Sequence, residues 1–247
     1  MLVLAIDTST RQVTVAAGTE RGLLGAITIG GPAASGPPRH TETLAPALDE
    51  LLRTTAISVG DLTAVGVGIG PGMFTGLRAG VVTATVMASA LSLPVAPIPS
   101  LDAVAAPLGA VTTGLVAAVV DARRAEVYHA LYRAESGRLE RVTDDAVSRP
   151  ADAARELLAR GEPILLCGDA TARLADADGD GAGVQFRRAG HAFDAPSPHA
   201  LVALTCEAAE RDELCAPETV RPRYLRKSDA EINADIRSER SPVASAS

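Results

Sequence analysis

The sequence is poor in aromatic residues and in lysine. Its 247 residues include no tryptophan, three tyrosines and three phenylalanines, and Lys227 is the single lysine. Proteins that grip single-stranded nucleic acid stack its bases on aromatic rings, so a base-stacking platform is not expected. Acidic residues outnumber basic ones to give a net charge of −7. This balance argues against a broad basic surface that would bind a phosphate backbone.

Cysteine and histidine are too few and too scattered for a disulfide framework or a metal centre. The three cysteines are Cys167, Cys206 and Cys215. They contain no C-x-x-C pair, and we expect reduced, buried thiols. The four histidines are His40, His129, His191 and His199. No two are three or four residues apart, so no helix face carries a pair of ligands, and no metal site is predicted. There is also no G-x-S-x-G segment to indicate a serine nucleophile.

Neither end of the chain nor any long apolar run indicates a membrane protein. The first residues, MLVLAIDTST, lack a basic region and reach Asp7 at once, so no signal peptide is expected. The uncharged stretch 79–101 contains Pro94. It leaves about 15 helical residues, fewer than the ~20 that span a bilayer. We therefore expect a buried helix, a cytoplasmic protein and no membrane partner.

Apolar runs ending in aspartate divide the chain into two similar halves. LAIDTSTRQVTVAAGTERGLLGAI at 4–27 and VAAVVDARRAEVYHALYRAESGRLERV at 116–142 both predict strand, Asp, polar turn, strand, small-residue turn and strand. Asp7 and Asp121 take equivalent places. Each half continues with helix, strand and helix. Helices are expected near 41–53, 73–91, 101–106, 151–160 and 197–213, and further strands near 64–69, 95–98 and 163–167.

This duplicated β-β-β-α-β-α order predicts an α/β protein with two mixed-sheet lobes facing each other across a cleft. We expect an N-terminal lobe at 1–110 and a C-terminal lobe at 111–226. The polar residues 227–247 are expected to form a disordered tail.

The densest motif is the glycine-rich segment GVGIGPGMFTGLR at 66–78, where a strand opens into a helix. Free N–H groups at such a turn can bind anions, but the spacing fits neither G-x-G-x-x-G nor the P-loop. The other interpretation is a tight turn packed closely on its own chain.

A stripe of small residues continues along the following helix at Gly76, Gly80, Ala84 and Ala88. It permits unusually close approach of another backbone, either the chain's own sheet or a helix of another protein. The leucines of the helix at 41–53 leave the same two possibilities open.

The two aspartate turns suggest one half of a nucleotide clamp. In two-lobed ATPases an acidic residue ends the first strand of each lobe near Mg²⁺ and the phosphates. Asp7, Thr8 and Ser9 fit this pattern, whereas the second turn, 121–124, lacks a glycine that would let the backbone approach phosphate. We therefore predict a vestigial nucleotide cleft at Asp7, Thr8 and Ser9.

Several segments together resemble the bacterial TsaB family of tRNA threonylcarbamoyladenosine biosynthesis proteins. They are LAIDTST, RHTETLAPALDELL, GVGIGPGMFTGLRAG, VDARRAEVYHALY and PRYLRKSDAE, which cover about residues 1–231 in order. The resemblance implies the actin-like/sugar-kinase (ASKHA) fold, with two ribonuclease-H-like lobes. It also implies a non-catalytic relative of TsaD, the enzyme that transfers a threonylcarbamoyl group to N6 of adenosine 37. That adenosine lies in tRNAs reading codons that begin with A.

The resemblance also implies partners. The chain would hold TsaD in its working state, join the ATPase TsaE, form a homodimer when alone, and meet tRNA only through the complex. No tightly bound cofactor is implied, with ATP or ADP placed at the complex interface. TsaD relatives carry a metal-binding His-x-x-x-His that this chain lacks. The implied partner face, on the first two long helices, consists of Leu44, Leu48, Leu51, Leu52, Phe74, Gly76, Leu77, Gly80, Val81 and Ala84.

Two other functions are compatible with the same fold. A stand-alone ATP-dependent phosphotransferase predicts Mg²⁺–ATP binding by the isolated chain. A metalloprotease needs a metal site that the histidine spacing does not supply. The roles of Arg78 and of residues 222–226 stay open.

Overall fold

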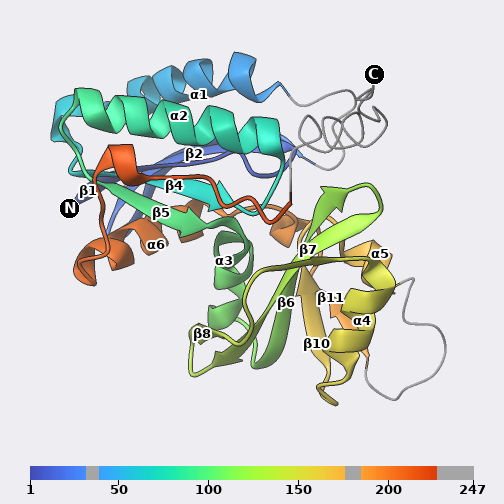
Figure 1. Ribbon diagram of the computed structural model, residues 1–247. Helices are drawn as coiled ribbons and strands as arrows, with labels where there is room; N and C mark the ends of the chain where they lie inside the picture. The colour runs from blue at the N-terminus through green and yellow to red at the C-terminus, as the bar shows by residue number, and fades with distance from the viewer. Residues whose placement is uncertain (32–38, 176–184, 227–247) are drawn as a thin grey trace, which may run out of the picture.

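The computed structural model describes residues 1–31, 39–175 and 185–226, and Figure 1 shows two lobes. The first repeat comprises β1 (Leu2–Asp7), β2 (Gln12–Thr19), β3 (Gly22–Gly30), α1 (His40–Thr55), β4 (Ala64–Gly70), α2 (Phe74–Ala90), β5 (Val95–Pro99) and α3 (Ser100–Ala105). The second comprises β6 (Gly114–Arg123), β7 (Glu126–Glu135), β8 (Arg138–Arg141), β9 (Ala146–Ser148), α4 (Pro150–Leu158), β10 (Ile164–Cys167), α5 (Thr171–Ala175), β11 (Phe186–Arg188) and α6 (Pro198–Glu210). The tail predicted at 227–247 lies outside the described residues.

The predicted duplication is confirmed by the topology of the two sheets. The first sheet has the order β3-β2-β1-β4-β5, and the second has the matching order β8-β7-β6-β10-β11, with β9 paired to β7. The central strand of the first sheet, β1, is antiparallel to β2 and parallel to β4, and that of the second, β6, is antiparallel to β7 and parallel to β10. Asp7 ends β1 and Asp121 lies near the end of β6, so they are equivalent. Beyond the β-β-β-α-β-α unit, the first repeat adds β5 and α3, and the second adds β9, β11 and α6.

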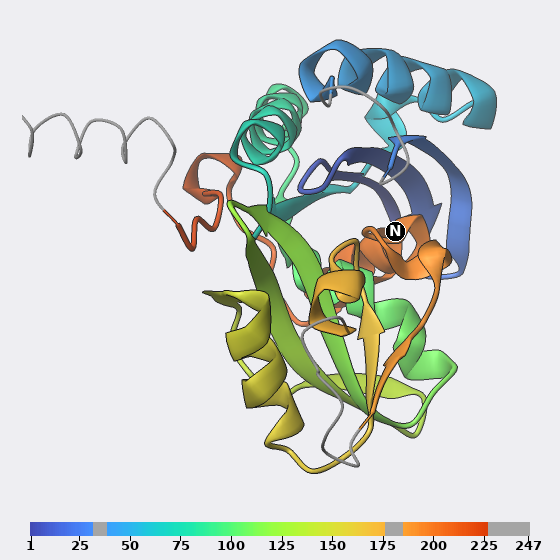
Figure 2. The same ribbon diagram turned by 90° about the vertical axis from the view of Figure 1, so that its right-hand side faces the viewer.

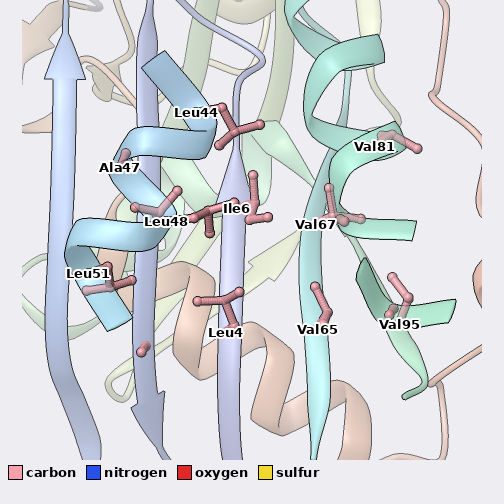
Figure 3. Close-up of a cluster of buried hydrophobic side chains, with 14 of the residues drawn as sticks. Leu4, Ile6, Leu44, Ala47, Leu48, Leu51, Val65, Val67, Val81 and Val95 are labelled. Atoms are coloured by element: carbon pink, nitrogen blue, oxygen red, sulfur yellow. The ribbon is translucent and has the colours of Figure 1, made fainter. Parts of the chain in front are cut away.

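The first sheet is covered on both faces because its central strand is apolar at successive positions. Leu4 and Ile6 of β1 pack under α1 and α2 (Figure 3), whereas Val3 points to the opposite face. That opposite face is covered by α6, whose Val202 and Cys206 pack against Val3. The helix that closes the first lobe therefore comes from the second repeat.

The second sheet mirrors this arrangement. Leu157 of α4 and Leu174 of α5 cover one face. The other face is covered by α3, which belongs to the first repeat and packs Leu101 and Val104 against Val116. Figure 1 shows α3 lying alongside β6. The repeats thus exchange their last helices across the expected boundary between 1–110 and 111–226. The last helix of each range contributes to the core of the other lobe.

The helix expected in the uncharged stretch 79–101 corresponds to α2. One side of α2 packs against the first sheet, and its other side is accessible to solvent. Among the described residues, no helix is both long and apolar enough to cross a bilayer.

Candidate functional site

The turn between β1 and β2 is organised around the buried carboxylate of Asp7. This carboxylate accepts hydrogen bonds from the backbone N–H of Ser9 (2.8 Å), the hydroxyl of Ser9 (2.7 Å) and the hydroxyl of Ser100 (2.8 Å). Burial raises the pKa of Asp7, and the hydrogen bonds from Ser9 and Ser100 oppose that rise. Asp7 therefore ties β1 to the start of α3.

The glycine-rich segment packs directly on this turn. A Cβ added at Gly76 would overlap the carbonyl oxygen of Thr8, and one added at Gly80 would overlap the Thr8 hydroxyl. A Cβ at Gly72 would likewise overlap the carbonyl of Ser9. These glycines permit two parts of the same chain to touch, so the interpretation as a tight internal turn is confirmed.

The same contact occupies the start of α2. The backbone N–H of Met73, which precedes the helix, donates to the carbonyl oxygen of Ser9 at 2.7 Å. The hydroxyl of Thr8 donates to the carbonyl oxygen of Gly76 at 2.7 Å. One of the N–H groups at this turn, that of Met73, is therefore used within the chain.

The second aspartate turn is tied down by charged neighbours. Asp121 accepts hydrogen bonds from the backbone N–H of Arg123 and from the guanidinium of Arg173, both at 2.8 Å. Its own N–H donates to Asp169 at 2.9 Å. Burial raises the pKa of Asp169 to about 6, and the nearby negative charge of Asp121 adds to the effect.

A small gap lies where these two turns meet. The gap is about 10 Å³, and it is lined by Thr10, Arg11, Met73, Val120, Asp121, Arg123 and Asp169. Small-molecule sites in proteins enclose roughly 300–1,000 Å³, and a single water needs at least about 10–15 Å³. Asp7, Thr8 and Ser9 do not line this gap. The cleft expected at these three residues stays a prediction. The structure places the Asp7 carboxylate and the hydroxyls of Thr8 and Ser9 in hydrogen bonds within the first repeat.

The predicted partner face stays a prediction, and the structure shows where its residues lie. Figure 3 shows leucines of α1 pointing into the core over β1. An amphipathic helix on a sheet turns its apolar stripe toward the sheet. Eight of the ten predicted residues are buried in this way: Leu44, Leu48, Leu51, Gly76, Leu77, Gly80, Val81 and Ala84. Leu52 and Phe74 are half-buried.

The accessible surface of α2 is its opposite side, where apolar residues remain exposed. Val82 is 57% exposed and Val86 is 63% exposed. Beside them runs a groove of about 710 Å³. Its second wall is the C-terminal segment 217–224, which Figure 2 shows in red next to α2. The groove is lined by Arg78, Val81, Val82, Thr85, Val86, Ser89, Ala90, Pro217, Glu218, Val220, Arg221, Pro222 and Tyr224.

An aromatic stack forms one end of this region. The Phe74 ring stacks on Tyr224 with centroids 4.7 Å apart, and the Arg78 guanidinium lies 5.2 Å from the Phe74 ring centroid. Such cation–π contacts hold a guanidinium over a ring face. The sequence alone did not predict this groove. The available signal was Arg78 together with residues 222–226, whose roles the sequence left open.

His40 contacts the first turn, and two of the three cysteines are buried. The Nε2–H of His40 donates to the carbonyl oxygen of Thr10 at 2.7 Å, and burial lowers the His40 pKa. Cys167 and Cys206 are buried, whereas Cys215 is half-buried and departs from the expectation. Within residues 1–31, 39–175 and 185–226, no group of three or more histidine, cysteine, aspartate or glutamate side chains could hold a metal ion.

Comparison with known proteins gives the chain a family. The family model for TsaD, described as tRNA N6-adenosine threonylcarbamoyltransferase, matches residues 37–234. A TsaB protein of Bacillus subtilis is 32% identical over 192 residues, covering 78% of this chain and 82% of that protein. An uncharacterized protein of Mycobacterium tuberculosis is 42% identical over 130 residues, covering 53% of this chain. The match spans only 58% of the length of that mycobacterial relative.

Solved structures agree with this result. YeaZ from Pseudomonas aeruginosa superposes with a TM-score of 0.72 at 27% identity, covering 91% of this chain and 99% of that one. EutJ from Carboxydothermus hydrogenoformans has a TM-score of 0.50 at 11% identity, over 83% of this chain and 90% of that one, a likeness of fold alone. The duplicated lobes define a protein of the actin-like/sugar-kinase class. Within that class, the chain belongs to the TsaB family.

Proposed function

We propose that this chain is the non-catalytic, activating subunit of the complex that adds a threonylcarbamoyl group to N6 of adenosine 37 in tRNA. It pairs with TsaD, and the pair is joined by TsaE in the cytoplasm. The TsaB relatives of Bacillus subtilis and Escherichia coli are both named as tRNA threonylcarbamoyladenosine biosynthesis proteins. The chain's net charge of −7 supports a subunit that meets tRNA through its partners.

The groove beside α2 is the observation that carries this proposal. Val82 and Val86 lie one turn apart and are more than half exposed, next to a hollow of about 710 Å³. Contiguous apolar surface of this kind marks protein–protein contacts. Arg78, Arg221 and Glu218 supply charged groups around it, as is typical of a polar interface rim. We assign this groove to TsaD, and to a second copy of the chain when TsaD is absent.

The engagement of the Asp7 carboxylate within its own repeat supports a non-catalytic role. This carboxylate accepts hydrogen bonds from Ser9 and Ser100, and the described gap beside Asp121 is about 10 Å³. The subunit therefore holds no nucleotide between its own lobes in this proposal. ATP or ADP belongs instead to the interface that it forms with its partners.

A reconstituted modification assay tests the function. Purified TsaC-type, TsaD and TsaE proteins are given tRNA, threonine, bicarbonate and ATP, with and without this chain. Threonylcarbamoyladenosine should form only when the chain is present, and not when TsaD alone is omitted. Equal modification without the chain would refute the proposal. Micromolar binding of Mg²⁺–ATP by the isolated chain would favour the phosphotransferase instead.

A substitution in the groove tests the surface. Val82→Asp with Val86→Asp should weaken TsaD binding at least tenfold, because two carboxylates would be desolvated in the interface. Val111→Asp is the matched control, since Val111 is 70% exposed and lies outside the groove. Isothermal titration calorimetry with TsaD would measure both. Equal affinities for the two variants would remove the groove from the interface.

A further inference from the structure

The segment after α6 crosses from one lobe to the other and is anchored in both cores. Val220 is buried in the hydrophobic cluster of the first lobe, together with Leu4 and Leu44. Leu225, five residues later, packs against the cluster of the second lobe that contains Val116. A short extended stretch therefore has one apolar anchor on each side of the boundary between the lobes.

Arg223, midway between these anchors, bonds to both lobes at once. Its backbone N–H donates to the carbonyl oxygen of Ile69 at 2.7 Å, at the end of β4 in the first lobe. Its guanidinium donates to Asp145 at 2.6 Å, in the loop between β8 and β9 of the second lobe. The Asp145 side chain is only 2% exposed, and Arg141 holds its other oxygen at 2.7 Å. Loss of one partner from a buried carboxylate is strongly unfavourable.

Arg226 adds a second contact to the same lobe as Asp145. Its guanidinium donates to the carbonyl oxygen of Ala122 at 3.1 Å and lies 3.5 Å from the carboxylate of Glu126. Both partners belong to the hairpin formed by β6 and β7, which also carries Asp121. The segment thus reaches the hairpin that faces the first lobe across the narrow junction.

We propose that residues 220–226 form a clasp that fixes the angle between the two lobes. Two-lobed proteins ordinarily change this angle by hinge motion, which opens and closes the space between the lobes. Here one residue, Arg223, spans the boundary with a backbone bond on one side and a charged side-chain bond on the other. The clasp keeps the junction at its small volume. This inference concerns the isolated chain and does not depend on the proposed function.

The same stretch offers a matched control residue. Arg221 donates only to carbonyl oxygens of the segment itself, those of Glu218 (2.6 Å) and Val220 (2.8 Å), among the contacts that the structure describes. Arg221→Met therefore removes a guanidinium next to Arg223 without removing a bond between the lobes. Arg223→Met with Arg226→Met removes two such groups and keeps most of the apolar stem of each side chain.

Pulsed electron spin resonance distances between the lobes test the clasp. Nitroxide labels are placed on the exposed helix positions Asp49→Cys in α1 and Ala151→Cys in α4, with half-buried Cys215 replaced by serine. The labelled protein with an unchanged clasp and its Arg221→Met variant should give the same narrow distribution of label-to-label distances. Arg223→Met with Arg226→Met should at least double its width or shift its maximum.

Two outcomes decide the matter. An unchanged distribution in the doubly substituted protein, with circular dichroism showing it folded, overturns the clasp. If the double variant does not fold, the single variant Arg223→Met is measured in its place. Arg223 is 45% exposed, and a distribution for this variant equal to that of Arg221→Met overturns the proposal equally.

Discussion

Replacing Gly80 by alanine tests whether the small-residue stripe faces the chain's own core. A Cβ at this position would overlap the hydroxyl of Thr8, which is fully buried and donates to the carbonyl oxygen of Gly76. The hydroxyl must turn away, because the helix backbone and β1 are both fixed by packing. The substitution therefore perturbs the lobe even though it adds a single methyl group.

The magnitude follows from three contributions. A buried hydroxyl without its acceptor costs about 1–3 kcal/mol, and overpacking costs about 1–3 kcal/mol. The better helix propensity of alanine returns about 1 kcal/mol. The net loss in the free energy of unfolding is about 3 kcal/mol for Gly80→Ala, which lowers the melting temperature by about 6–12 °C. Gly60→Ala should change stability by less than about 0.5 kcal/mol, since a Cβ there meets only Ser58 Oγ at 3.7 Å.

Urea unfolding of a double-mutant cycle provides the assay. Thr8→Ala removes the overlapping hydroxyl, so Thr8→Ala with Gly80→Ala should be about as stable as Thr8→Ala alone. The interaction energy is then about 2–3 kcal/mol in favour of the double variant. Simple addition of the two single costs would contradict the packing described for Gly80. If Gly80→Ala left stability normal but weakened TsaD binding, the small-residue stripe would contact the partner rather than the chain's own core.

Two further predictions concern pH. Because burial raises the pKa of Asp169 to about 6, its carboxyl favours the folded state at low pH, and this contribution is lost as pH rises through 6. Asp169→Asn should therefore raise the free energy of unfolding at pH 8 by up to about 3 kcal/mol, and hardly change it at pH 4. Thermal unfolding measures both values, and an equal gain at the two pH values would argue against a raised pKa of Asp169. Burial lowers the pKa of His40, so its contribution is lost as pH falls through the unfolded value of about 6.5. His40→Gln should flatten the decline of stability between pH 7 and 5.5. His199→Gln, which replaces an exposed histidine, serves as control, and identical slopes for the two variants would refute the assignment.

Much of the fold could be predicted because the repeating pattern is local. The runs ending in Asp7 and Asp121 are apolar at successive positions, which indicates strands covered on both faces. Their equivalence follows from order alone. The exchange of α3 and α6 could not be predicted in this way, because an apolar helix face shows that it is buried but not which sheet buries it.

The site was harder to predict for a related reason. The spacing of Gly76 and Gly80 correctly indicates close approach, but two partners satisfy it equally, and only the position of Thr8 decides between them. Asp7 has the residue type of a nucleotide ligand, yet its role depends on Ser100, 93 positions away. The groove beside α2 combines Val86 with Tyr224, and no sequence pattern links residues so far apart.

The exchange of last helices has a consequence for synthesis on the ribosome. The first sheet is complete once β5 has been made, yet its face around Val3 is covered by Val202 and Cys206 of α6. Translation adds roughly 110 residues between the ends of β5 and α6, which takes about 5–20 s at 5–20 residues per second. An apolar sheet face stays open for that interval. The nascent chain therefore presents a binding surface for chaperones that the finished protein no longer has.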